Sequence, residues 1–186
     1  MTEYTSHPQE PSQPAPATRA ETSPPGADAA FPPQEISAFL RFCAGEWMAL
    51  RSRFALGEGT AMAEGDEWHS SERGDLVVAY LEPGSADSHG GLSVGGKGEP
   101  ARRLLFAANG SFSLDGHQGE QRGSWQLWPD GSLELILSEN SREVRERIWF
   151  TKPNLRLRST VESKADGTPG RASFSSEIRR VSRPAG

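Results

Sequence analysis

The chain has 186 residues, a formal net charge of −5 and a mean hydropathy of −0.61. This length is enough for one domain with a sizeable core, and the acidic balance argues against a nucleic-acid-binding surface. No apolar run reaches the length of a membrane span. The one cysteine, Cys43, cannot form an internal disulfide and fits a reducing compartment. We therefore expect a cytoplasmic protein that contacts neither nucleic acid nor membrane.

Residues 1–33 differ in composition from the rest of the chain. They hold eight of the fourteen prolines and a single basic residue, Arg19. Such a segment buries too little apolar surface to become ordered, and it lacks the basic start and apolar centre of a secretory signal. The sequence predicts a disordered proline-rich tail over 1–33 and one folded domain over 34–186.

Residues 34–42 are predicted to form the one helix of the chain. An apolar stripe at helical spacing runs through Ile36, Phe39, Leu40 and Cys43. Gly45 follows the stripe and ends the helix. Cys43 is interpreted as a small core residue rather than a nucleophile, because no neighbouring group would lower the pKa of its thiol.

The remainder of the chain carries strand signals separated by turn signals. Nine strands are expected, over 46–56, 74–81, 102–108, 111–114, 124–128, 132–137, 143–151, 155–160 and 171–181. Asn109-Gly110 and Pro129-Asp130-Gly131 are typical of tight hairpin turns, and the glycine-rich residues 84–101 are expected to form a link. Repeated hairpins favour an all-β, antiparallel up-and-down barrel, which leaves no open sheet edge.

Gly45-Glu46-Trp47 stands directly after the predicted helix. This Gly-x-Trp tripeptide resembles the start of lipocalin-like and fatty-acid-binding-protein-like barrels, which also carry a short helix in front of it. In those barrels the tryptophan packs at the closed end, often under an arginine from the last strand. The resemblance implies a calyx closed at Trp47, with Arg179 or Arg180 as the covering arginine.

Residues 143–160 form a predicted hairpin with charged residues on an apolar face. Glu146 shares a face with Ile148 and Phe150. Arg156 and Arg158 share one face of the next strand, where their Cα atoms are expected about 6.6 Å apart. The pattern leaves two interpretations open. On the outside of a sheet these charges are solvated and carry no function. On the inside they line a cavity, where unpaired charge is costly and an anionic ligand would offset it.

Other motifs in the chain do not predict a site. Gly91-Leu92-Ser93-Val94-Gly95 matches the nucleophile elbow of hydrolases, but the glycine-rich residues 96–100 cannot supply the helix that this elbow needs. The four histidines lack metal-ligand spacing, so no metal site is expected. Three tryptophans are interpreted as packing residues rather than stacking platforms: Trp68, Trp125 and Trp128.

Three C-terminal segments resemble, in order, the signature of the phycobiliprotein chromophore lyases of the S/U type. They are residues 146–150 (ERIWF), 153–160 (PNLRLRST) and 172–179 (ASFSSEIR). The resemblance favours the cavity interpretation of the charged hairpin face. Two features depart from the family: the middle section 84–101 is shorter than usual, and Arg53-Phe54 stands where the family often has histidine.

The resemblance implies a lyase that attaches a phycobilin, such as phycocyanobilin or phycoerythrobilin, to a cysteine of a phycobiliprotein α or β subunit. The linear tetrapyrrole is the substrate, and no cofactor is expected. Glu146 is implied as the catalytic residue, which either pairs with a protonated pyrrole nitrogen or donates a proton as the thiol adds. The implied bilin-binding residues are Arg51, Ser52, Arg156, Arg158 and Ser159. A second copy of the chain or a partner lyase subunit is a further expected partner.

The chemistry of the ligand agrees with these residue types. A phycobilin carries two propionates, and arginine guanidinium groups match carboxylates with two parallel hydrogen bonds. Two other functions fit the same pattern: a bilin carrier without catalysis, and a calyx for a different small apolar ligand.

Overall fold

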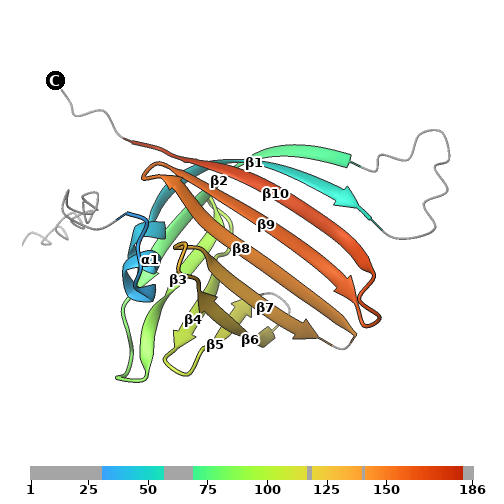
Figure 1. Ribbon diagram of the computed structural model, residues 1–186. Helices are drawn as coiled ribbons and strands as arrows, with labels where there is room; N and C mark the ends of the chain where they lie inside the picture. The colour runs from blue at the N-terminus through green and yellow to red at the C-terminus, as the bar shows by residue number, and fades with distance from the viewer. Residues whose placement is uncertain (1–30, 57–68, 117–118, 140, 182–186) are drawn as a thin grey trace, which may run out of the picture.

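The computed structural model describes residues 31–56, 69–116, 119–139 and 141–181. One helix, α1 (Ile36–Cys43), precedes ten antiparallel strands in this part of the chain. The strands are β1 (Gly45–Ala55), β2 (His69–Leu81), β3 (Ser88–Gly96), β4 (Arg102–Ala107), β5 (Ser111–Gly116), β6 (Gly119–Leu127), β7 (Leu133–Glu139), β8 (Arg142–Lys152), β9 (Leu155–Lys164) and β10 (Pro169–Arg179). Each strand pairs with the next, and β1 pairs with β10 to close the barrel (Figure 1). The predicted up-and-down barrel with a short N-terminal helix is confirmed.

Strand β3 is the main departure from the predicted elements. Residues 84–101 were expected to form a link, but Ser88–Gly96 pairs with β2 on one side and with β4 on the other. The glycines allow this close pairing: a Cβ atom added to Gly91 would lie 2.2 Å from the carbonyl oxygen of Leu104 in β4. The barrel therefore has ten strands instead of nine, and β2 begins at His69 instead of residue 74.

The N-terminal boundary of the folded body also differs from the expected residue 34. Phe31 lies 6.0 Å from Phe42 between ring centroids, and Pro33 is buried. These contacts bring residues 31–33 into the packed body, because an aromatic ring and a proline supply apolar surface. Residues 1–30 of the predicted tail lie outside the described residues.

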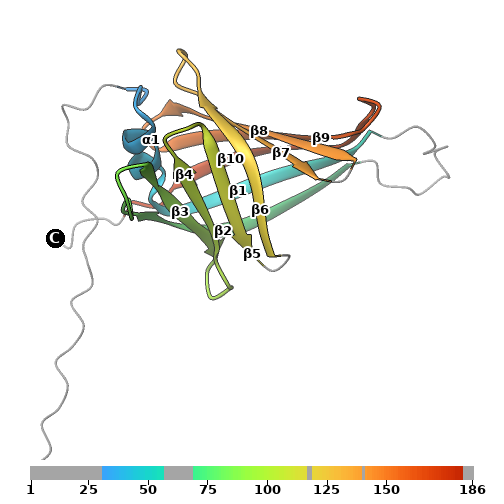
Figure 2. The ribbon, with the colours of Figure 1, turned by 90° about the horizontal axis from the view of Figure 1, so that it is seen from below.

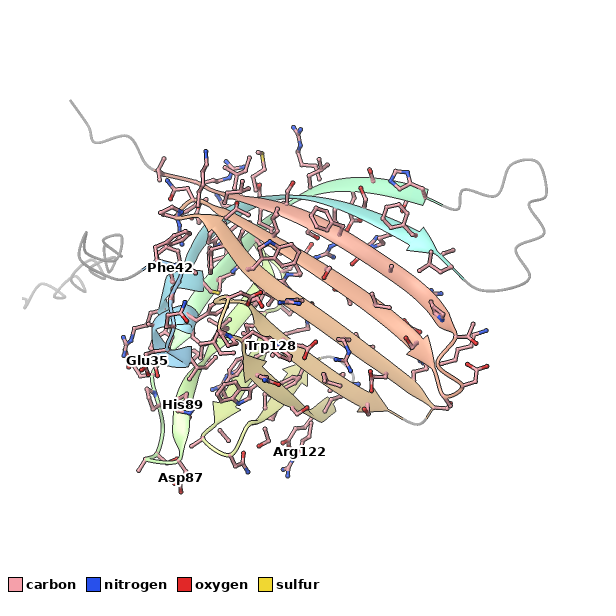
Figure 3. The ribbon with its side chains drawn as sticks, in the orientation of Figure 1. Glu35, Phe42, Asp87, His89, Arg122 and Trp128 are labelled. Atoms are coloured by element: carbon pink, nitrogen blue, oxygen red, sulfur yellow. The ribbon has the colours of Figure 1, made fainter. Side chains whose placement is uncertain are left out.

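Helix α1 lies across one end of the barrel in both ribbon views (Figures 1 and 2). The predicted stripe is buried, with relative exposures of 6% for Ile36 and 0% for Phe39, Leu40 and Cys43. The ring of Phe150 at the end of β8 packs edge-on against Phe39 at 5.3 Å and against Phe42 at 4.7 Å. Phe42, labelled in Figure 3, lies where the helix meets the strand ends. The helix thus plugs the barrel by burying aromatic surface. Of the described helices, none is long and apolar enough to cross a bilayer.

Trp47 at the start of β1 completes the closed end. Its ring is fully buried, and its indole N–H donates a hydrogen bond to the carbonyl oxygen of Cys43 at 2.9 Å. The guanidinium carbon of Arg179 lies 4.2 Å from the ring centroid, and that guanidinium also donates to the carbonyl oxygens of Phe42 and Ala44. The predicted tryptophan–arginine pair is confirmed with Arg179. Arg180 instead pairs with Asp75 at an exposed position.

The interior of the barrel has an apolar wall and a charged wall. The apolar wall is built mainly from strands β2 to β8, through Val78, Leu92, Phe106, Phe112, Leu133, Leu135 and Ile148. The charged wall lies on β1, β10, β9 and β8, which are neighbours in the barrel. An interior of this kind suits a ligand that is mostly apolar and carries a few anionic groups.

Candidate functional site

The strand register arranges the interior side chains of the charged wall in three rows. Residues paired across the strands share a face, and every second residue of a strand points inward. The row nearest α1 is Ala49, Glu177, Arg156 and Phe150. The middle row is Arg51, Ser175, Arg158 and Ile148. The outermost row is Arg53, Ser173, Thr160 and Glu146.

Exposure rises along these rows toward the end of the barrel opposite α1. The side chain of Arg156 is 1% exposed, that of Arg158 is 16% exposed and that of Arg51 is 29% exposed. Glu146, in the outermost row, is 22% exposed. Because only partly exposed groups can meet a ligand without rearrangement, the middle and outermost rows form the candidate site.

Arg156 and Glu177 form a buried ion pair beneath the closed end. Both Nε and Nη2 of Arg156 lie 2.5 Å from Oε2 of Glu177, and neither side chain is more than 1% exposed. The guanidinium carbon of Arg156 also lies 4.4 Å from the ring centroid of Trp47. Burial raises the pKa of Glu177, but the positive charges of Arg158 and Arg156 outweigh it and hold that pKa below its ordinary value. Glu177 is therefore a buried carboxylate, and Arg156 is closed off by its partners.

Arg158 bridges two carboxylates on the neighbouring strands. Its Nη1 donates a hydrogen bond to Oε1 of Glu146 at 3.1 Å, and its Nε lies 3.3 Å from Oε1 of Glu177. The hydroxyl of Thr160 donates to the other oxygen of Glu146 at 3.4 Å. Burial lowers the pKa of Arg158, but the carboxylates of Glu146 and Glu177 outweigh it and raise that pKa.

Three buried polar atoms of this cluster make no hydrogen bond to the described residues. They are Nη2 of Arg156, Nε of Arg158 and Oε1 of Glu177. The last two face each other at 3.3 Å, so they attract by charge without hydrogen-bond geometry. Buried polar atoms are almost always bonded in folded proteins. Arg158 of the middle row and the Arg156–Glu177 pair beneath it thus retain hydrogen-bonding capacity, which is typical of a site that receives a polar ligand.

Arg51 adds a second partly exposed guanidinium to the middle row. Its Nε donates to the hydroxyl of Ser175 at 3.2 Å, and its Nη1 lies 3.7 Å from Glu72. Burial, and then the positive charges of Arg158 and Arg53, lower the pKa of Arg51. A guanidinium beside other guanidinium groups is an electrostatically favourable position for an anion.

The charged wall carries a surplus of positive charge, although the whole chain is acidic. Its three rows hold Arg51, Arg53, Arg156 and Arg158 against Glu146 and Glu177, and Glu72 of the neighbouring strand β2 pairs with Arg51 and Arg53. Four positive and three negative charges leave a net charge of +1 (4 − 3) on these seven residues, against −5 for the chain. The wall therefore attracts a carboxylate into the barrel.

The structure brings together four of the six predicted site residues: Arg51, Glu146, Arg156 and Arg158. Ser52 and Ser159 do not join them. Ser52 faces outward, with its hydroxyl 3.1 Å from that of Ser71. Ser159 is paired in register with Arg147 and Phe174 on the outer face. Each serine follows an inward arginine directly, and adjacent residues of a strand point to opposite faces.

Glu177 was not among the predicted site residues. It lies in the C-terminal signature segment, and its inward orientation follows from its pairing with Arg156 across β9 and β10. A hint in the sequence is that it is the only acidic residue in the apolar and small-residue strand Pro169–Arg179.

Of the remaining sequence candidates, Cys43 and Trp125 have packing roles, whereas Trp128 lies at the surface. Cys43 is completely buried, and burial raises the pKa of its thiol, which confirms it as a core residue. Trp125 donates its indole N–H to the carbonyl oxygen of Ala107 at 3.1 Å. Trp128, labelled in Figure 3, is 36% exposed and has the guanidinium of Arg147 6.0 Å from its ring centroid. Trp68 lies outside the described residues.

A hollow of about 560 Å³ lies apart from the charged wall, at the turns between β7 and β8 and between β9 and β10. It is lined by Ser138, Ser141, Arg142, Glu143, Ser163, Lys164, Ala165 and Gly167. None of the predicted site residues lines it, so we assign the candidate site to the interior wall.

The amino-acid sequence is similar to those of known proteins. A family model described as CpeS-like protein matches residues 117–180. Chromophore lyase CpcS/CpeS 1 of Paulinella chromatophora is 45% identical over 157 residues, which cover 82% of this chain and 92% of the relative. Chromophore lyase CpcS/CpeS 1 of Trichodesmium erythraeum (strain IMS101) is 29% identical over 168 residues, covering 77% of this chain and 96% of the relative.

The solved structure of the S-type phycobiliprotein lyase from Guillardia theta has the same fold. It aligns with a TM-score of 0.56 at 17% identity, over 80% of this chain and 94% of that chain. At such low identity the likeness concerns the fold alone. The Paulinella protein is 45% identical over nearly its whole length, and this similarity shows the family of the chain. This chain belongs to the CpcS/CpeS family of chromophore lyases.

Proposed function

We propose that this protein binds a phycobilin inside its barrel and promotes covalent attachment of the bilin to a cysteine of a phycobiliprotein subunit. The observation that carries the proposal is the bridge from Glu146 to Arg158, which places an acceptor and a donor side by side in the barrel interior. Family membership supports the reaction class. The buried, unpaired thiol of Cys43 supports the expected cytosolic location.

Arg158 and Arg51 are the proposed partners of the bilin propionates. They are the guanidinium groups of the middle row, and both are partly exposed inside the barrel. A charge-assisted hydrogen bond of this kind contributes about 1.5–3 kcal/mol. Arg156 has a different proposed role, because it is only 1% exposed and is held between Glu177 and Trp47. It anchors the wall instead of meeting the ligand.

Glu146 is the proposed partner of a pyrrole nitrogen of the bilin. Its two carboxyl oxygens accept hydrogen bonds from Arg158 and Thr160. This geometry favours the first of its two predicted roles, in which the carboxylate pairs with a protonated pyrrole nitrogen and keeps the bilin electrophilic. The acceptor cysteine then forms a C–S bond by adding its thiol across the exocyclic ethylidene double bond, and the thiol proton ends on the bilin. The addition needs no oxidant or reductant.

Co-expression with a phycobiliprotein subunit and a bilin-producing pathway tests this function. Covalent colour on the subunit is the expected result. Colour that stays on this protein would favour the bilin-carrier alternative, and the absence of colour on either protein would contradict bilin binding. Glu146→Gln keeps the shape of the side chain but removes its charge. We expect this variant to bind bilin and to transfer it at least tenfold more slowly, because a neutral amide no longer stabilises the positive charge on the pyrrole nitrogen.

We also propose that a second copy of the chain covers the outer face of β1, β10 and β9. Outward positions on these strands are uncharged apart from Glu46 near the start of β1 and are largely apolar, and three of them are exposed: Leu50 at 47%, Phe174 at 41% and Ile178 at 49%. Large exposed apolar patches mark interaction sites. Strands of 10 to 11 residues, together with β8, span about 36 Å by about 19 Å, close to the roughly 800 Å² per partner of a stable interface. The outward Glu143, Arg145 and Arg147 of β8 would form a charged border of this face.

A face with an uncharged centre favours self-packing, because two copies meet there without opposing the like charges that the acidic chains carry elsewhere. Sedimentation analysis of wild type against Ile178→Glu tests this arrangement. A dimer that becomes monomeric in the variant is the expected result. A wild-type monomer, or a dimer unaffected by the substitution, would contradict it.

A further inference from the structure

We infer that Glu177 is a positioning residue for ligand binding: its buried carboxylate fixes the orientation of Arg158 toward the barrel interior. The inference rests on the proposed function, and it assigns a role to a side chain that a ligand cannot reach, since Glu177 is 0% exposed. The two carboxylate oxygens have separate partners. Oε2 is held by Arg156 at 2.5 Å, and Oε1 faces Nε of Arg158 at 3.3 Å.

The anchoring of Arg158 comes from both sides of its strand. On the β8 side, Glu146 accepts a hydrogen bond from Nη1, and on the β10 side, Glu177 attracts Nε. In the proposed function Glu146 is engaged by the bilin, so it cannot also be relied on to orient Arg158. Glu177 is the partner that stays in place, because its other oxygen is locked by a guanidinium that is itself stacked on Trp47.

Fixing Arg158 has a physical benefit for ligand binding. A free arginine side chain loses rotamer entropy when it is immobilised, and pre-organisation removes that cost from the binding step. Nε of Arg158 and Oε1 of Glu177 lie 3.3 Å apart without hydrogen-bond geometry, so Glu177 orients Arg158 by charge.

A purely structural role for the Arg156–Glu177 pair is the competing explanation. The two roles separate in a double variant, Arg156→Met with Glu177→Leu. Replacing a whole buried ion pair by apolar residues of similar volume is often neutral or stabilising, so this variant keeps the core filled while it removes the anchor of Arg158. The single variant Glu177→Gln leaves Arg156 partly unpaired, and we expect it to lower the melting temperature.

The experiment compares wild type, Glu177→Gln, the double variant and a control at an exposed ion pair, Arg180→Ala with Asp75→Ala. Three quantities are measured: the melting temperature, the Kd for phycobilin by absorbance titration, and the Nε–H NMR signal of Arg158 in the ligand-free protein, assigned by its loss in Arg158→Lys. Positioning predicts that the double variant melts close to wild type, loses the protected Nε–H signal and binds bilin about tenfold more weakly, equivalent to 1.4 kcal/mol. The control should match wild type in all three.

If the double variant matches wild type in both bilin affinity and melting temperature, the inference is overturned. The Arg156–Glu177 pair would then affect binding only through the stability of the protein. An unchanged Nε–H signal in the double variant would overturn it as well, since Arg158 would be ordered without its anchor. A wild-type protein that binds no bilin would instead contradict the proposed function. The NMR signal would still decide whether Glu177 orders Arg158.

Discussion

Replacing Arg156 with methionine should destabilise the protein strongly, even though the side chain lies in the predicted ligand cavity. The substitution leaves Glu177, which is completely buried, with Arg158 at 3.3 Å as its remaining ion-pair partner among the described residues. It also removes a guanidinium from the face of Trp47. Both losses fall at the closed end of the barrel, beneath helix α1.

The size of the effect follows from the burial of the pair. Breaking a buried ion pair by removing one partner typically costs about 3–5 kcal/mol. Arg156 and Glu177 are 1% and 0% exposed, so solvent screening does not reduce this figure. In a domain of this size 1 kcal/mol corresponds to roughly 2–4 °C in melting temperature, and we expect a fall of roughly 10 °C.

Urea unfolding at neutral pH, followed by tryptophan fluorescence, measures this difference directly. Arg180→Met is the matched control, because Arg180 belongs to an exposed ion pair at 53% and 43% exposure. Exposed pairs contribute about 0–1 kcal/mol. If Arg156→Met and Arg180→Met unfold at the same urea concentration, the Arg156–Glu177 pair does not support the closed end and the reasoning is refuted.

Three further outcomes are expected. Trp47→Ala should lower the free energy of unfolding by about 3–5 kcal/mol in urea titrations, and native stability in that variant would contradict a role at the closed end. The pKa of Glu177 is lower in the folded protein than in the unfolded chain, so the unfolded chain takes up the proton first as the pH falls. The free energy of unfolding of wild type should therefore fall as the pH drops below the ordinary pKa of 4.5. In calorimetry, the melting temperature of Glu177→Gln should depend less on pH in this range. Gly91→Ala should lower the melting temperature because its Cβ would meet the carbonyl oxygen of Leu104, whereas Gly74→Ala meets nothing within 4 Å and should be tolerated; equal melting temperatures would count against the close pairing of β3 with β4.

Local patterns in the sequence were sufficient for the closed end and for one face of the site. The apolar stripe through Phe39 and Cys43 predicted the helix. The resemblance of the Gly-x-Trp motif to lipocalin-like barrels predicted the contact between Trp47 and Arg179 at the closed end. Period-two alternation placed Glu146 and Arg158 on shared faces, and the barrel closes with those faces inward. The same alternation places Ser52 and Ser159 on the outer face. The resemblance implied both as site residues because it was applied without regard to this alternation.

The rest depended on information that no short segment contains. Strand β3 has few β-branched residues, and its pairing depends on the space that Gly91 leaves beside β4. The role of Glu177 depends on its register with Arg156, which is set only when β9 and β10 pair. That pairing also corrects the cavity interpretation, which expected a costly unpaired charge at Arg156. Arg156 is instead paired with Glu177, so its loss should destabilise the protein.

In the proposed function, Arg158 faces a ligand inside the barrel. Absorbance titration of purified protein with a phycobilin tests this placement, with Arg158→Leu compared with Arg145→Leu. Arg145 lies on the outer face of β8, is 48% exposed and pairs with Glu134, so it is the matched control. We predict a Kd raised about 10- to 100-fold for Arg158→Leu, which corresponds to the loss of one charge-assisted contact, and a change below about twofold for Arg145→Leu. Equal bilin affinity in wild type and Arg158→Leu would contradict this placement.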